Sequence, residues 1–512
     1  MNRRIPIFNS SIIIPSVALL AVSWVSFVQA GPPWKQVHKM LATDGSEGDV
    51  LGDAVAMDGN LAVVGAEFAF GSITNSGAAY VFDLTTGQQL LKLLPDDPGA
   101  DSDQFGFSVA IEGNIALVGA RWDDDNGIDS GSAYLFDVNT GQQLFKLLPS
   151  DGAAGSVFGT SVALSGNIAL VGAAGDEENG IASGSVYVFD ATTGAQLNKL
   201  RPLDAASGYG FGFTSSLSGN IAVIGAWGVD DVGENSGAAY IFDVTTGEQL
   251  FKLNASDAAS GDLFGNSVAI DGNTILVGAQ FHASKGGNSG AAYVFDATTG
   301  EQLYNLSASD ASSGSEFGYA VAVNGSTAVI SAIADNAKGF RSGSAYVFDV
   351  STGGQLYKLI ASDGKALSGF GFDVDVQGTV ALIGSDLTED NGKSSGSAYV
   401  YHLLNLTDQL TVSPDPLIAG QNGTFSVTGA LPNHATWLIY SLKGLKPRFI
   451  NQLNTSIDLM NPILADGPEN TDANGDLDFV LPIPNINNSL IVWFQTVQKR
   501  NSTNFVATQI TP

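Results

Sequence analysis

The chain contains no cysteine, and it has only four histidines and four methionines among its 512 residues. Without cysteine, neither disulfide bonds nor thiolate-based metal or catalytic sites can form. The sequence also contains no His-Glu-x-x-His zinc motif. The four histidines occupy unrelated positions in the sequence, namely His38, His282, His402 and His434. We therefore do not predict an enzyme.

Basic residues are scarce as well. The sequence has 21 Lys and Arg against 51 Asp and Glu, which gives a formal net charge of −30 at pH 7. Such a surface repels nucleic acid and anionic lipid, so neither is an expected partner. It is compatible with calcium or cationic partners, and equally with a well-solvated secreted surface.

Only one long apolar run is present, and it lies near the N-terminus. Arg3 and Arg4 precede a mainly apolar stretch from Ile12 to Val28, which ends at Ala30. A basic start, an apolar centre and a small residue at the cleavage site predict a signal peptide over residues 1–30, and thus a secreted or cell-surface protein. The alternative is an uncleaved anchor. No later stretch is apolar for about 18 residues, so no membrane span is expected after signal removal.

Most of the chain is a repeat. One unit contains Phe105-Gly106, the turn 112–114, the apolar run 115–120 and the motif 132–137. The Phe-Gly pair recurs every 53 residues, at Phe158, Phe211, Phe264, Phe317 and Phe370, and Leu51-Gly52 stands 54 residues before Phe105. Seven copies with a period near 50 are typical of a radial repeat architecture.

Each unit predicts four short antiparallel strands, which in this copy are residues 105–111, 115–120, 132–138 and 142–148. Seven such sheets predict an all-β, seven-bladed β-propeller over residues 34–405. Residues 35–44 match the fourth-strand pattern, and the seventh copy stops after its third strand at His402. We therefore expect the N-terminal strand to complete the last blade and close the ring, which removes an open sheet edge.

The Phe-Gly pairs, together with later Gly-Ala pairs such as Gly65-Ala66 and Gly119-Ala120, resemble the FG-GAP repeat of integrin alpha-chain propellers, here of a bacterial secreted type. The resemblance implies an extracellular propeller used in adhesion. Integrin-type repeats often carry an Asp-rich calcium loop between strands one and two. Here that place holds only short turns such as Asp58-Gly59-Asn60, so those calcium ligands are not transferred to this chain.

The two ends of the blades differ in sequence. The turns between strands one and two and between strands three and four are short and alike, and we predict that Asp83 and its equivalents cap the latter. The connections between strands two and three and from strand four to the next blade are predicted to be longer, irregular and different in each blade. We call the face that bears them the loop face and predict that it binds the ligand. Aromatic residues of its two-to-three loops are the candidate ligand contacts, namely Phe68, Trp122, Trp227, Phe281 and Phe340. The alternative is that these side chains fold down and cover the blade ends.

No cofactor is firmly implied, and calcium is the one for which acidic residues are available. On the loop face Asp123 and Asp125 are candidate ligands. The second candidate is a loop with alternating oxygen ligands, formed by Asp472, Asn474, Asp476 and Asp478. Solvated turns without metal explain both segments as well.

A further Asp recurs once per unit after the fourth strand, at Asp44, Asp97, Asp151, Asp204, Asp257, Asp310 and Asp363. These seven carboxylates either form a cation-attracting ring at the mouth of a central channel or cap their turns. The sequence leaves both explanations open.

Beyond the repeat, residues 410–512 contain short alternating runs broken by prolines, which predict a small C-terminal β-sandwich-like module. The preferred function is a monomeric, secreted or cell-surface binding or adhesion protein whose variable loops bind an extracellular protein or a glycan. The alternative is an extracellular enzyme that uses carboxylates of the acidic face on a polysaccharide.

Overall fold

The computed structural model describes residues 34–71, 76–97 and 102–402 with their side chains. It also describes, as backbone alone, Leu403 and the strands between residues 409 and 511. Within these described residues the regular elements are strands, and no helix is present. The predicted signal peptide, residues 1–30, lies outside the described residues.

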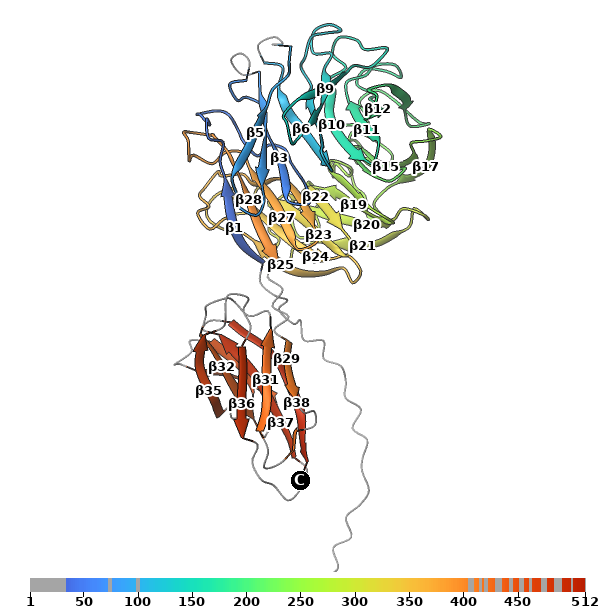
Figure 1. Ribbon diagram of the computed structural model, residues 1–512. Helices are drawn as coiled ribbons and strands as arrows, with labels where there is room; N and C mark the ends of the chain where they lie inside the picture. The colour runs from blue at the N-terminus through green and yellow to red at the C-terminus, as the bar shows by residue number, and fades with distance from the viewer. Residues whose placement is uncertain are drawn as a thin grey trace, which may run out of the picture.

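Seven four-stranded antiparallel sheets, the blades, form a ring (Figure 1). Blade one contains β2 (Val55–Asp58), β3 (Leu61–Ala66), β4 (Ala78–Asp83) and β5 (Gln89–Leu93). Blade two contains β6 (Phe105–Glu112), β7 (Ile115–Ala120), β8 (Ser132–Asp137) and β9 (Gln143–Leu147). Blade three contains β10 (Phe158–Ser165), β11 (Ile168–Ala173), β12 (Ser185–Asp190) and β13 (Gln196–Leu200). Blade four contains β14 (Thr214–Ser218), β15 (Ile221–Ala226), β16 (Ala238–Asp243) and β17 (Glu248–Leu253).

Blade five contains β18 (Val268–Asp271), β19 (Thr274–Ala279), β20 (Ala291–Asp296) and β21 (Gln302–Leu306). Blade six contains β22 (Phe317–Asn324), β23 (Thr327–Ala332), β24 (Ser344–Asp349) and β25 (Gly354–Leu359). Blade seven contains β26 (Phe370–Gln377), β27 (Val380–Ser385), β28 (Ser397–Leu403) and, from the start of the chain, β1 (Trp34–Met40). The predicted all-β, seven-bladed fold is confirmed, and the strands of blade two agree with their predicted bounds to within one residue.

The Phe-Gly and Gly-Ala pairs lie where neighbouring blades approach most closely. Phe105 is fully buried, and its ring packs edge-on against Tyr134 at a centroid distance of 5.4 Å. Gly106 has a φ of +94°, and a Cβ at Gly65 would lie 2.0 Å from the carbonyl oxygen of Gly106. A side chain at either glycine would push adjacent blades apart, which explains why both recur. The equivalent phenylalanines form parallel bridges to a Ser-Gly glycine of the preceding blade, as Phe105 does to Gly77.

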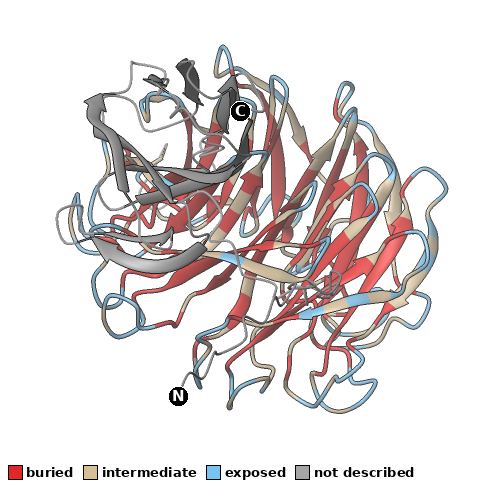
Figure 2. Ribbon diagram, turned by 90° about the horizontal axis from the view of Figure 1, so that it is seen from below, coloured by how far each residue is buried: buried red, intermediate tan, exposed pale blue. Residues whose placement is uncertain are grey.

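The hydrophobic core is divided among the blade interfaces rather than concentrated in one centre. Seven clusters of buried side chains each join two adjacent blades, including the pair formed by blades seven and one. Strands two and three of each blade are buried on both faces, because the neighbouring blades cover them. Strand four is half-exposed, as in β9, and Figure 2 shows this change from buried strands to exposed outer strands and loops.

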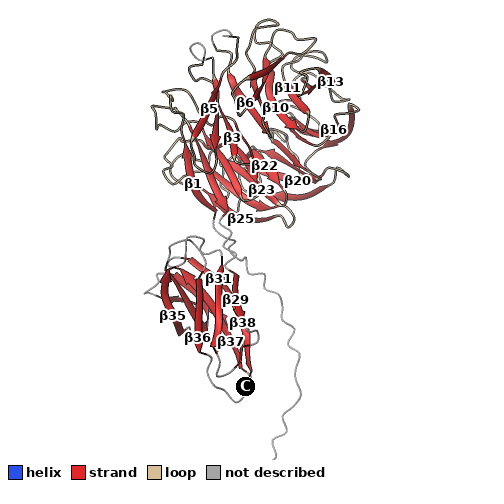
Figure 3. Ribbon diagram, in the orientation of Figure 1, coloured by secondary structure: helices blue, strands red, loops and turns tan. Residues whose placement is uncertain are grey.

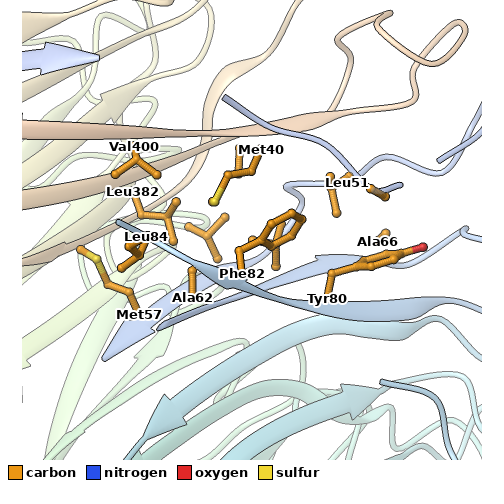
Figure 4. Packing of buried hydrophobic residues seen from close by; sticks show 14 of the residues in the cluster. Met40, Leu51, Met57, Ala62, Ala66, Tyr80, Phe82, Leu84, Leu382 and Val400 are labelled. Carbon is orange, nitrogen blue, oxygen red and sulfur yellow. The ribbon is translucent and has the colours of Figure 1, made fainter. Parts of the chain in front are cut away.

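Ring closure occurs as predicted. β1 pairs antiparallel with β28, with Lys39 opposite Tyr399 and Met40 opposite Ala398. Met40 is fully buried and packs among residues of blades seven and one (Figure 4), including Leu382, Val400 and Phe82. The N-terminal strand therefore completes the seventh blade and joins the interface with the first.

The face opposite the loop face consists of tight turns. The predicted cap is confirmed, because Asp83 Oδ1 accepts hydrogen bonds from the backbone N–H groups of Thr85 and Thr86. A second set of bonds links the one-to-two turns of successive blades. In it, the side chain that ends each inner strand accepts the N–H of a glycine in the next blade, as Asp58 does from Gly113 at 2.7 Å. The same bond closes the circle between Gln377 and Gly59 at 2.8 Å.

Two carboxylates line the inner edge between blades seven and one. Asp373 accepts the backbone N–H of Val55 at 2.8 Å, and Asp375 accepts that of Met57 at 2.7 Å. Burial raises the pKa of Asp373 to about 6 and that of Asp375 to about 7, against the opposing effect of these backbone hydrogen bonds. In the part of the ring between blades four and five a neutral side chain has this role, since Ser216 accepts from Ile270.

The C-terminal strands form separate sheets. The first sheet contains β29 (Gln409–Ser413), β31 (Asn422–Thr428) and β36 (Leu477–Pro482). The second contains β30 (Leu417–Ile418), β38 (Asn501–Thr511), β37 (Leu490–Gln498), β32 (Ala435–Ser441) and β35 (Ile463–Asn470). β33 (Leu445–Ile450) pairs with β34 (Thr455–Leu459). Figure 3 shows these strands, and the prediction that they form a β-sandwich stays a prediction.

Candidate functional site

The two-to-three connections of the loop face share one backbone conformation in six of the seven blades. In blade two, Gly131 N–H and Ser130 Oγ both donate to the carbonyl of Asp123. The residue before this serine has a positive φ of 49–55° in all six blades, at Asp129, Ala182, Asn235, Asn288, Arg341 and Ser394. For these six connections, our prediction of an irregular backbone is therefore wrong. The bridge between each Ser-Gly glycine and the next blade fixes the path of the loop, and only its side chains vary.

An ion-pair network joins neighbouring blades at the outer edge of the loop face. Lys199 Nζ of β13 contacts Asp151 Oδ2 at 2.7 Å, Asp176 Oδ2 at 2.9 Å and Glu178 Oε2 at 2.9 Å. The Tyr187 hydroxyl of β12 donates to both aspartates. Burial acts to raise the pKa values of these aspartates, but hydrogen bonds and the Lys199 charge outweigh it and lower both.

The same arrangement recurs around the ring. The lysines concerned are Lys39, Lys92, Lys146, Lys199, Lys252 and Lys358. Blade five has Asn305 in place of the lysine, and there Asn305 and His282 contact Asp257. The recurring aspartates are thus bound by the next blade's fourth strand, the outermost strand of the sheet. They lie at the rim and tie blades together, rather than forming a ring at the mouth of a central channel. Asp44, Asp151, Asp310 and Asp363 also accept a backbone hydrogen bond at their own turns, in agreement with the capping alternative.

The candidate calcium ligands Asp123 and Asp125 do come together, with Asp97 as a third carboxylate. Lys146 Nζ lies among them, 2.5 Å from Asp97, 3.1 Å from Asp123 and 2.6 Å from Asp125. This ammonium group supplies the positive charge that a metal would bring. Calcium binding at this position stays a prediction. Of the second candidate, Asp472, Asn474 and Asp476 lie outside the described residues, and only the backbone of Asp478 is described.

The structure does not gather the five candidate aromatic residues into one site, because each belongs to a different blade. Phe340 and Trp122 are exposed, at 66% and 36% of their surface. Phe68, Trp227 and Phe281 are half-buried. The Trp227 ring packs edge-on against Phe213 at 6.3 Å. The rings of Phe340 and Trp122 are thus accessible, whereas the other three are partly covered; a ligand-binding role of these residues stays a prediction.

Around the axis the loop face holds a charged cluster that sequence reasoning missed. Arg121 Nε donates to Gln104 Oε1 at 2.6 Å, and its guanidinium lies 3.5 Å from the Phe107 ring centroid and 3.9 Å from Glu67 Oε2. Asp53 hydrogen-bonds with Glu67, and burial together with the Glu67 charge raises the pKa of Asp53 well above its ordinary value. Burial raises the pKa of Glu67 as well, against the opposing effects of the Asp53 hydrogen bond and the Arg121 charge.

Asp386 belongs to this cluster, and burial raises its pKa to about 7, with the Glu67 charge adding to the effect. Among the described residues, Asp386 Oδ1, Glu67 Oε2 and Gln104 Nε2 are buried without a hydrogen-bond partner. In the sequence, each acid or arginine of this cluster stands directly after a Phe-Gly or Gly-Ala pair or its equivalent, at a position that differs from repeat to repeat.

A cleft of about 300 Å³ opens on the loop face between blades six and seven. Residues 365–368 and 387–390, with Lys393 and Ser394, form most of its wall, and Lys39, Asp363 and Tyr399 complete it. Its ion pairs are those of Lys39 with Asp363 and Asp390. Exposed Leu367 and Leu387 bring apolar surface to the same cleft.

These features define a seven-bladed propeller whose loop face carries the candidate sites. The FG-GAP repeat matches residues 34–82, 88–136, 142–189, 195–242, 248–295, 301–348 and 354–401. The chain therefore belongs to the FG-GAP repeat family. Each matched segment starts with an outer strand and continues into the next blade, in agreement with the closure by β1. A comparison with curated proteins finds no match.

FG-GAP propellers are typically non-enzymatic binding scaffolds, and proteins with this repeat are often extracellular or on the cell surface. The described part of the chain contains no helix long and apolar enough to cross a membrane.

Proposed function

We propose that the protein is a secreted or cell-surface binding protein that holds an extracellular protein or a glycan on its loop face. One observation carries this proposal. Of the sixteen exposed large apolar side chains in the described residues, ten lie on the loop face and six on the outer strands. The ten are Phe70, Trp122, Ile128, Ile181, Leu203, Phe213, Val232, Phe340, Leu367 and Leu387. Exposed apolar side chains gathered on one face favour a binding surface.

The shared backbone of the loops supports the same proposal. Hydrogen bonds and bridges hold each loop in place, while its side chains differ from blade to blade. Little ordering of the loops is then needed when a ligand binds, which favours affinity. Secretion is part of the proposal and rests on Arg3, Arg4 and the apolar run that ends at Ala30. N-terminal sequencing of the exported protein should find Gly31 first, and retention of Arg3 would contradict export by cleavage.

The binding proposal is tested with glycan and protein arrays probed with residues 31–512. Trp122→Ala/Phe340→Ala removes two exposed aromatic rings from the loop face. Asn114→Ala/Asn167→Ala is the matched control on the opposite face, where both side chains are exposed and the backbone carbonyls make the turn contacts. We expect the first variant to lose array binding at an unchanged melting temperature and the control to bind normally. Binding by the first variant equal to that of the unmodified protein would refute the assignment to this face.

The carboxylates at the axis favour one alternative, an extracellular enzyme acting on a polysaccharide. Burial raises the pKa values of Asp53 and Glu67, and it raises that of Asp386 to about 7; raised pKa values of neighbouring carboxyl groups are typical of acid–base sites. Release of reducing ends from a panel of polysaccharides, abolished by Glu67→Gln, would support this alternative. Absence of release by the unmodified protein, with array binding retained, would leave binding as the function.

A further inference from the structure

Blade five differs from the other blades in the ion-pair network at the rim. In the other six blades, a lysine of the outermost strand binds the recurring aspartate. In blade five this lysine is replaced by Asn305 on β21, and the aspartate is Asp257. His282 takes the place of the loop aspartates that contact the lysine in blades two, three and six. Blade five therefore has an imidazole beside a carboxylate where these blades have an ammonium group among carboxylates.

Hydrogen bonds fix the His282 ring with one nitrogen towards Asp257. His282 Nδ1 lies 2.9 Å from Asp262 Oδ2. Asp262 is buried, and the same oxygen accepts the backbone N–H of Ala259 at 2.8 Å. Because a carboxylate accepts, Nδ1 carries the proton and the lone pair of the neutral ring is on Nε2, the nitrogen nearer Asp257. A carboxylate that orients an imidazole in this way is typical of histidines that bind metal.

The distance between His282 Nε2 and Asp257 Oδ2 is 3.6 Å. A hydrogen bond between such atoms would be shorter, at about 2.7–3.2 Å. Zinc binds imidazole nitrogen and carboxylate oxygen at about 2.0–2.1 Å, so two such ligands at a tetrahedral angle lie about 3.4 Å apart. The two atoms therefore need a shift of only about 0.2 Å to bind one zinc ion together.

Neighbouring groups can complete a metal site here. The Tyr293 hydroxyl donates to Asp257 Oδ1 at 2.8 Å, which leaves Oδ2 for a metal. Asn305 Nδ2 lies 2.8 Å from this Oδ2, and a half-turn of the amide brings its carbonyl oxygen there as a third ligand. The Asp257 side chain is 45% exposed, so water can reach a fourth position. Within the described residues, Lys285 of the same loop is not paired with Asp257 but donates to the Ala308 carbonyl at 2.9 Å.

We propose that His282, Asp257 and Asn305 bind one divalent transition-metal ion. Zinc is the ion that best suits imidazole and oxygen ligands in a tetrahedral arrangement. Asp262 and Tyr293 orient the ligands from behind, as the outer groups of metal sites do. The ion supplies at blade five the positive charge that a lysine supplies in the other six blades. This site goes beyond the proposed binding function and does not depend on it.

Isothermal titration calorimetry of zinc into residues 31–512 tests the proposal. We expect one saturable site, whose affinity falls at least about tenfold in both His282→Gln and Asp262→Asn. Asn305→Lys introduces the residue of the other six blades and should abolish the site, because its ammonium group takes the place of the ion. His38→Gln is the matched control, since it removes an imidazole on β1 whose Nε2 contacts the Thr85 carbonyl of a tight turn.

Absence of saturable zinc binding by the unmodified protein would overturn the proposal and leave His282 as a structural replacement for the lysine. Equal zinc affinities of Asn305→Lys and His38→Gln would also overturn it, because zinc would then bind elsewhere. Melting temperatures provide a second measurement: zinc should raise those of the unmodified protein and of His38→Gln, but not that of Asn305→Lys. If His282→Gln is unfolded, the comparison of Asn305→Lys with His38→Gln decides the outcome.

Discussion

Replacing Met40 by alanine tests whether the N-terminal strand stabilises the whole ring. Met40 is fully buried in the cluster that joins blades seven and one (Figure 4). Truncation of a buried methionine to alanine costs about 2–5 kcal/mol, through lost burial and the cavity left behind. An unfolding entropy of about 2.1 cal/mol/K per residue, over roughly 370 residues, gives about 0.8 kcal/mol/K. A loss of about 3 kcal/mol then lowers the melting temperature by about 4 °C if the propeller unfolds as one unit.

Differential scanning calorimetry with size-exclusion chromatography measures this effect. Lys35→Ala is the control, since Lys35 is exposed on the same strand. Deletion of residues 34–44 should go further, because it exposes the edge of β28 and favours aggregation. A Met40→Ala melting temperature within about 1 °C of the unmodified protein, or a deletion variant that stays monomeric and equally stable, would refute the role assigned to closure.

Three further predictions concern the ring. Gly131→Ala should lower the stability in urea unfolding far more than Gly113→Ala. The new Cβ at residue 131 would lie 1.9 Å from the backbone oxygen of Phe158, whereas a Cβ at residue 113 would have no neighbour within 4 Å. Equal losses would contradict the close approach of the blades. Lys199→Met should lower the free energy of unfolding by about 2 kcal/mol, because it leaves the buried carboxylate of Asp176 unpaired. Lys92→Met should lower it by less than about 1 kcal/mol, because its partner Asp44 is half-exposed. The reverse order of the two losses would refute the argument from the ion-pair network. Asp375 has a folded pKa of about 7, so its stabilising effect is complete at low pH and is lost as pH rises towards 7. Asp375→Asn should therefore gain stability relative to the unmodified protein between pH 5 and pH 8, by at most about 1.4 kcal/mol per pH unit. A difference in stability that does not depend on pH would exclude this titration.

The sequence by itself determined the repeat, the strands and the closure. A period of 53 residues and alternating apolar positions are local properties of the chain, and they are visible without knowing which residues touch. Even the fourth-strand pattern at residues 35–44 identified the partner of the incomplete seventh copy. The Asp83-type caps were also predictable, because the aspartate bonds to backbone only two and three residues away.

Only the tertiary structure decided what the polar residues do. The sequence offered a ring at the channel mouth or turn caps for the recurring aspartates, but it did not indicate their partner. Asp151 binds Lys199, 48 residues later, on the next blade's outer strand. The charged cluster around the axis brings together Asp53, Glu67, Arg121 and Asp386, although Asp386 follows Asp53 by 333 residues in the sequence. Ion pairs and hydrogen bonds between acids depend on distances of a few ångströms between side chains of different blades. The repeat determines which blades are neighbours, but only the packed interfaces decide which charges meet.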